Sequence, residues 1–190
     1  MIALLLLAGV SSFFFFGWYD YRCLCGNKRS AYWWFIAGAL LLSGATVGLL
    51  DGSEIRHLWS SQGWIKALEL IGAIACLAGL VYTLFFALPV GSYADDGRVE
   101  LVDRGIYALC RHPGVWWLGL FYLLVWLWCE QTPILWGGLL FTALDILYVY
   151  WQDRWVFEKS IEGYAEYKSR TPFLIPSGGS IRRCFYSRSS

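Results

Sequence analysis

Two pairs of polar residues stand within apolar segments or at their edges, where their types and spacing would allow chemistry. The first is Arg111 with His112, in the stretch "YALCRHPGVWW" directly before Pro113. An arginine side chain presents a planar fork of N–H donors that matches a carboxylate or a phosphate, and histidine adds a further donor or acceptor. The second is Asp145 with Asp153, near the end of another apolar run. Anchoring of lipid headgroups by Arg111 and His112 is the simpler alternative at this point.

Asp145 is the polar residue that lies deepest within an apolar run. A carboxylate in such a position is costly and normally faces a cavity or a partner. On a helix of about 3.6 residues per turn, Asp145 shares a face with Tyr148 and Gln152, and Asp153 follows directly. We predict that Asp145 and Tyr148 line a substrate pocket. The alternative is that Asp145 only forms a hydrogen bond with a neighbouring helix.

The elements that must position these residues are transmembrane helices. The chain of 190 residues is 58% hydrophobic, 19% aromatic and only 15% charged, which is not the composition of a water-soluble domain. A hydrocarbon core of about 30 Å needs roughly 20 mostly apolar residues per helix. Five runs approach or exceed that length, at residues 1–16, 31–50, 64–89, 114–130 and 133–152. The sequence therefore predicts an all-α integral membrane bundle of five transmembrane helices.

The connections and the C-terminal part complete this predicted architecture. Only residues 130–132 separate the last two runs, which predicts a tight antiparallel hairpin. Beyond residue 152, apolar residues at helical spacing predict one amphipathic helix through "DRWVFEKSIEGYAEYKSRTP", lying against the membrane or capping the bundle. Pro172 and Pro176 then predict an extended segment. We expect a single domain over residues 1–176 and a flexible basic tail over 177–190.

Lysine and arginine residues predict the orientation, since cytoplasmic loops carry an excess of them. If the N-terminus is outside, all but two of the lysines and arginines fall on the cytoplasmic side of the membrane. The C-terminus and the segment around Arg111 and His112 are then cytoplasmic, together with the end of the last run near Asp153. The residues expected inside are Arg22, Lys28, Arg29, Arg98, Arg104, Arg111 and the C-terminal basic residues.

Two classes of partner do not fit the composition. The formal net charge is +1, and no basic stripe is interleaved with base-stacking aromatic residues, so we expect no nucleic-acid partner. The six cysteines are scattered, without paired CxxC units or histidines at zinc-ligand spacing, so we expect no metal site.

The order of motifs in residues 100–176 resembles the superfamily of isoprenylcysteine carboxyl methyltransferases and phospholipid methyltransferases. "DRGIYALCRHP" is followed by a hydrophobic span, a short hairpin, another span, and "GYAEYKSRTPFLIP". The chain departs from the family pattern in two places. Gly114 to Trp117 lack the usual tyrosine and glycine, and Gln152 with Asp153 replaces a Glu-Glu pair. The matching positions are Gly105, Tyr107, Arg111, His112, Pro113, Tyr164, Tyr167, Pro172, Ile175 and Pro176.

This resemblance implies an enzyme that transfers a methyl group from S-adenosylmethionine (SAM) to a lipophilic small-molecule or lipid-linked acceptor. It implies that the catalytic half is about residues 91–176 and that the catalytic residues are Arg111, His112 and Asp153. Arg111 would then pair with the cofactor carboxylate, and Asp153 would accept hydrogen bonds from the ribose or the amino group. The cofactor-binding residues implied are Tyr107, Arg111, His112, Trp116, Trp117, Gln152, Asp153, Tyr164 and Tyr167.

Two alternative functions remain open from the sequence. Membrane sterol and steroid reductases have a similar Arg-His-Pro element and a similar tail, and they bind a nicotinamide cofactor, although they usually carry more spans. A membrane scaffold or transporter subunit without catalysis is the other alternative. Titration with SAM and with NADPH separates the three possibilities.

Overall fold

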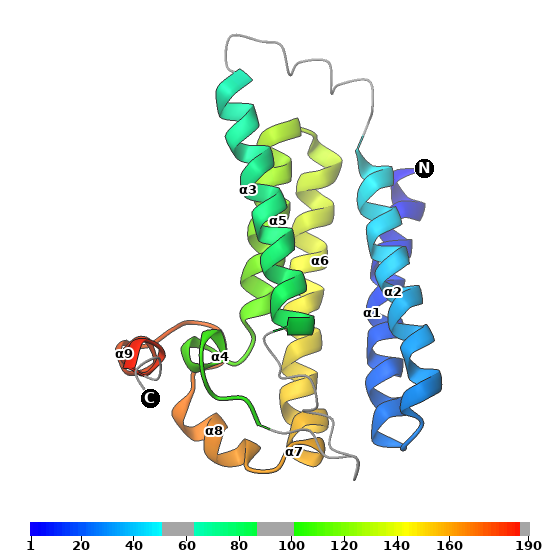
Figure 1. The fold of residues 1–190 in the computed structure, drawn as a ribbon. Coiled ribbons are helices and arrows are strands. Elements are labelled where there is room, and N and C mark those ends of the chain that lie inside the picture. Colours follow the sequence, from blue (N-terminus) through cyan, green and yellow to red (C-terminus); the bar gives the residue numbers. More distant parts are fainter. Residues whose placement is uncertain (51–62, 87–100, 187–190) are drawn as a thin grey trace. The chain divides into compact units, whose positions relative to one another are not determined.

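The computed structural model describes residues 1–50, 63–86 and 101–186, and these residues form helices without a β-strand (Figure 1). Two helices, α3 and α6, continue into π-helical turns, which are wider than an α-helix because each carbonyl bonds five residues ahead. In chain order the elements are α1 (Ile2–Leu24), α2 (Lys28–Leu49), α3 (Gly63–Val81) with its π turn (Tyr82–Phe86), α4 (Ile106–Leu109), α5 (Pro113–Cys129), α6 (Thr132–Trp151) with its π turn (Gln152–Val156), α7 (Phe157–Ser160), α8 (Tyr164–Arg170) and α9 (Gly178–Tyr186).

Four helices among the described residues are long and apolar enough to cross a membrane. This finding indicates a multi-pass membrane protein. α5, the fourth predicted span, is apolar but shorter than the other four, so the number of five spans stays a prediction. The four helices are Ile2–Leu24, Ser30–Leu49, Gly63–Phe86 and Thr132–Ser160.

The structure tests two predicted boundaries, the end of the first helix and the connection between α5 and α6. The first helix does not end near Phe16 as expected but continues to Leu24. It stops where Gly26 takes a positive φ of 80°, the conformation in which glycine commonly ends a helix. The tight connection between α5 and α6 is confirmed, since α5 ends at Cys129 and α6 begins at Thr132.

The chain forms two compact units, of which the first comprises Met1–Leu77 and Leu118–Tyr148. Within this unit α1 and α2 pack along each other. Small residues allow the close approaches: a Cβ atom added at Gly48 of α2 would lie 2.6 Å from Leu5 of α1, and one at Gly138 of α6 would lie 2.6 Å from Tyr122 of α5. Elsewhere on α2, Gly44 has open space around it, with nothing within 4 Å of an added Cβ atom.

We expect Gly9→Ala to lower the thermal unfolding midpoint of the purified protein by several degrees. A methyl group at Gly9 would overlap the ring of Phe141, which is fully buried, because the added Cβ atom would lie less than 3.0 Å from its Cζ atom. Overpacking of this kind costs about 1–3 kcal/mol. Gly44→Ala is the matched control, because nothing lies within 4 Å of its added Cβ atom. Equal midpoints for the two variants would contradict the packing of α1 on α6.

The second unit comprises Ala78–Trp117 and Val149–Ser190. The single amphipathic helix predicted beyond residue 152 is wrong. The chain continues as the π turn and α7, becomes extended at Ile161 and starts α8 only after Gly163, whose φ is 76°. Because glycine adopts this left-handed conformation without steric cost, Gly163 is the physical reason for the break.

The end of the second unit lies beside α4. The segment from Thr171 to Ser177 is not helical, as its two prolines predicted. The backbone N–H of Arg111 donates to the carbonyl oxygen of Pro172 at 3.0 Å, which attaches this segment to the connection between α4 and α5. The region expected to be a tail contains α9, which packs against α4 (Figure 1).

Candidate functional site

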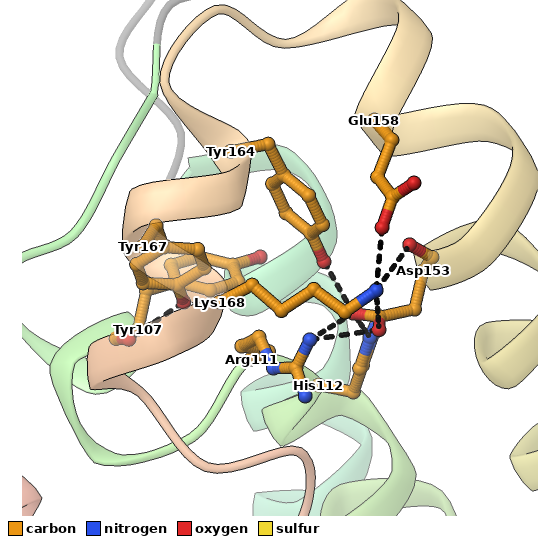
Figure 2. A network of polar contacts seen from close by, with 8 residues as sticks. All are labelled: Tyr107, Arg111, His112, Asp153, Glu158, Tyr164, Tyr167 and Lys168. Atoms are coloured by element: carbon orange, nitrogen blue, oxygen red, sulfur yellow. Dashed lines mark hydrogen bonds and ion pairs between the residues drawn. The ribbon is translucent and has the colours of Figure 1, made fainter.

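A buried ionic cluster in the second unit brings together four of the predicted site residues (Figure 2). Arg111 and His112 lie in the short connection before α5. Pro113 begins that helix, a position where its missing N–H carries no penalty, and it favours an extended backbone at the residue before it. Asp153 lies in the π turn after α6, and Tyr164 is the first residue of α8. Arg111 and Asp153 are 42 residues apart in the sequence, yet their side chains are in contact.

The carboxylate of Asp153 is the centre of this cluster. Nη1 of Arg111 lies 2.7 Å from each of its two oxygens, and the hydroxyl of Tyr164 donates to Oδ1 at 2.5 Å. Nε2 of His112 lies 3.3 Å from Oδ1, and Nζ of Lys168 lies 3.4 Å from Oδ2. A carboxylate offers about four lone-pair positions. The protein itself therefore uses most of the acceptor capacity of Asp153.

The guanidinium of Arg111 is held on two sides. Its Nη1 pairs with Asp153, and its Cζ lies 5.5 Å from the ring centre of Phe173, within cation–π range. Its Nε is buried and has no hydrogen-bond partner among the described residues. A buried donor without an acceptor is unfavourable, so this Nε is the atom of the cluster best suited to an external acceptor.

His112 is packed between aromatic rings. Its ring stacks on Phe157 at 5.9 Å and meets Phe173 edge-on at 5.0 Å. Burial lowers the pKa of His112, and this effect exceeds the opposing influence of the Asp153 carboxylate. His112 is therefore neutral at pH 7. It can donate one hydrogen bond and accept another, but it brings no charge to the cluster.

The three predicted tyrosines form hydrogen bonds that connect the surrounding elements. The hydroxyl of Tyr167 donates to the carbonyl oxygen of Tyr107 at 2.7 Å, and the hydroxyl of Tyr107 donates to the carbonyl of Thr83 at 2.8 Å. Burial raises the pKa values of Tyr164 and Tyr167, and the Asp153 carboxylate raises that of Tyr164 further. Both therefore stay protonated donors. Their hydroxyls bind protein groups, while contact of the three residues with a cofactor stays a prediction.

The two tryptophans differ in their surroundings. Trp116 is exposed, and its Nε1 donates to the carbonyl oxygen of Leu174 at 2.9 Å. Trp117 packs on α3, where a Cβ atom added at Gly79 would lie 2.7 Å from its ring. Its Nε1 is buried without a hydrogen-bond partner among the described residues. Gln152 is placed next to Asp153 in the same π turn.

The predicted substrate-pocket residues belong to the first unit rather than to the unit with the cluster. The hydroxyl of Tyr148 donates to Oδ2 of Asp20 at 2.6 Å, and its ring lies near Phe13 and Phe16. Asp20 is buried in α1, beyond the predicted end of that span. The role of Asp145 and Tyr148 in a pocket stays a prediction.

Sequence analysis missed three contributors to the cluster. Lys168 pairs with Glu158 at 2.6 Å as well as with Asp153, and Phe157 and Phe173 enclose His112. For Lys168 and Phe173, the sequence offered only their positions as a signal of this role. Lys168 follows Tyr167, and Phe173 lies between two prolines. Phe157 appeared only as one apolar residue of the predicted amphipathic helix.

Comparison with models of protein families, with characterised proteins and with solved structures finds no match to this chain. Among the described residues, no group of three or more histidine, cysteine, aspartate or glutamate side chains is arranged to hold a metal ion. The functional argument therefore depends on the geometry of the cluster.

Proposed function

We propose that this protein is an integral membrane methyltransferase that uses SAM and acts on a lipophilic acceptor. The observation that carries the proposal is the buried, unpartnered Nε of Arg111, next to an Nη1 that Asp153 holds in place. A ligand carboxylate that reaches this side of the guanidinium would satisfy the unpartnered donor, and SAM has such a carboxylate. The motif order from Gly105 to Pro176 adds independent support from sequence.

The hydrogen-bond donors around Asp153 indicate that this residue holds a neighbouring side chain in position. Four protein groups already approach its carboxylate, so we assign it to holding Arg111 rather than to contacting the cofactor. Neutral His112 then supports the same carboxylate without adding a charge. Arg111 is left as the residue of the cluster that binds the cofactor directly.

Aromatic side chains near Arg111 suit the remaining parts of the cofactor. Phe173 faces the guanidinium, and the exposed ring of Trp116 lies near the backbone of Leu174, the residue after Phe173. Such rings stack on adenine and attract a sulfonium cation. When bound, SAM supplies the electrophilic methyl group. The residues of this chain contribute binding, orientation and exclusion of water, which account for most of the acceleration that such a transfer needs.

We propose a lipophilic acceptor because the chain is a multi-pass membrane protein. A carboxylate, an amine or a thiol on a lipid-like molecule satisfies this requirement. The excess of lysine and arginine on one side supports a cytoplasmic location for Arg111, Asp153 and the C-terminus, with the N-terminus outside.

Calorimetric titration of the detergent-purified protein with SAM, S-adenosylhomocysteine and NADPH tests the proposal. We expect SAM and S-adenosylhomocysteine to bind with one site per chain and NADPH to give no heat of binding. Binding of NADPH alone would instead support a reductase. Binding of none of the three would favour a protein without a nucleotide-like cofactor.

A further inference from the structure

The C-terminal part of the chain has an unbalanced charge. Glu166 is the last acidic residue of the sequence, and five basic residues follow it: Lys168, Arg170, Arg182, Arg183 and Arg188. Two of them lie on α9, where both are exposed. Arg182 makes no hydrogen bond or ion pair with any residue that the structure describes. α9 therefore carries two exposed arginines and no acidic residue.

The same helix also exposes apolar side chains. Ile181 and Phe185 are four residues apart, so they share one face of α9, and they are 43% and 69% exposed. Ile175, just before the helix, is 75% exposed. A short helix with an exposed apolar face and neighbouring arginines is typical of segments that lie in the interfacial layer of a membrane.

Hydrogen bonds place this segment next to the start of an apolar helix. Nε1 of Trp116, one turn into α5, donates to the carbonyl of Leu174, which precedes the exposed Ile175. Tryptophan is concentrated at membrane–water interfaces, so the exposed Trp116 marks that level on α5. A guanidinium nitrogen of Arg183 donates to the carbonyl oxygen of Arg170, and α9 packs on α4 (Figure 1). These contacts attach α9 near the level of Trp116.

We propose that α9 binds the surface of an anionic membrane, with Ile181 and Phe185 inserted among the lipid chains and Arg182 directed to lipid phosphates. Excess positive charge favours anionic lipids over neutral ones. The exposed apolar face favours a lipid surface over a soluble polyanion, because it gains nothing from the latter. This inference goes beyond methyl transfer and does not depend on it.

Amide hydrogen exchange of the full chain in lipid nanodiscs tests this inference. One set of discs contains phosphatidylcholine alone, and the other contains phosphatidylcholine mixed with phosphatidylglycerol. We expect the amides of residues 178–186 to exchange about fivefold more slowly, or more slowly still, in the anionic discs, since each arginine near an anionic surface contributes about that factor. High salt should remove the difference because it screens the attraction.

Variants identify the side chains responsible. Ile181→Ser combined with Phe185→Ser should abolish the slowing, and Arg182→Gln should reduce it. Lys159→Gln removes an exposed cation from α7 and should leave the exchange of α9 unchanged. Equal exchange in the two kinds of disc, or slowing that survives the double substitution, would overturn the inference.

Discussion

Replacing Asp153 by asparagine is expected to lower the stability of the protein by about 3–5 kcal/mol, the usual cost of removing one partner from a buried ion pair. Asparagine keeps the size of the side chain but removes the negative charge. Arg111, whose side chain is 10% exposed, then loses its ion-pair partner, and Lys168 keeps Glu158 as its ion-pair partner. The affinity for SAM should fall as well, because the guanidinium of Arg111 is no longer held in one position.

Thermal unfolding in detergent and SAM titration of the same preparation measure both effects. Glu158→Gln is the matched control, because it removes the other carboxylate that pairs with Lys168. Glu158 is 46% exposed, so its pair with Lys168 is worth little and its loss should have only a small effect. Similar losses of stability in the two variants would show that Asp153 is not the centre of the cluster.

Replacing Arg111 by lysine is expected to weaken SAM binding by about 10- to 100-fold while the protein stays folded. Lysine keeps the positive charge and can still pair with Asp153, but it lacks the Nε donor and the planar group that lies over Phe173. A hydrogen bond to a charged group contributes about 1.5–3 kcal/mol, which corresponds to that loss of affinity. Calorimetric titration measures the change.

Arg154→Lys provides a closely matched control for Arg111→Lys. Arg154 follows Asp153 directly, and its Cζ lies 5.5 Å from the ring centre of Tyr150, the same distance as between Arg111 and Phe173. It is exposed and outside the ionic cluster, so the substitution should leave SAM affinity unchanged. An unaltered affinity in Arg111→Lys as well would place the cofactor carboxylate elsewhere.

The sequence predicted those parts of the fold that depend on local pattern. Long apolar runs predicted the membrane-spanning helices, and the short connection at Glu130 and Gln131 followed from the polar residues between two such runs. The predicted first span ended at residue 16, whereas α1 continues through Gly17 and the polar residues Asp20 and Arg22 to Leu24. The break at Gly163 was missed because the apolar spacing continues across it.

For the site, sequence order brought Arg111, His112, Asp153 and Tyr164 into one hypothesis, and the structure places these four side chains together. The contributions of Lys168 and Phe173 could not be predicted in the same way. Their contacts depend on the direction that the chain takes after the turn at Gly163 and after Pro172. Gly163 and the prolines mark where the chain turns, but the spacing of apolar residues does not show which side chains the turns bring together. The pairing of Tyr148 with Asp20 joins residues 128 positions apart and is equally invisible to local patterns.

The π turn at Gln152–Val156 couples the ionic cluster to the hydrogen-bond register of its helix. A π turn accommodates one residue more than an α-helical turn, and one residue corresponds to about 100° of rotation around the helix axis. A return of this turn to α-helical geometry would therefore rotate Asp153 relative to the residues after it, which include Tyr164 and Lys168. The contacts that Asp153 makes with Arg111, Tyr164 and Lys168 therefore favour the π geometry of this turn over the α-helical one.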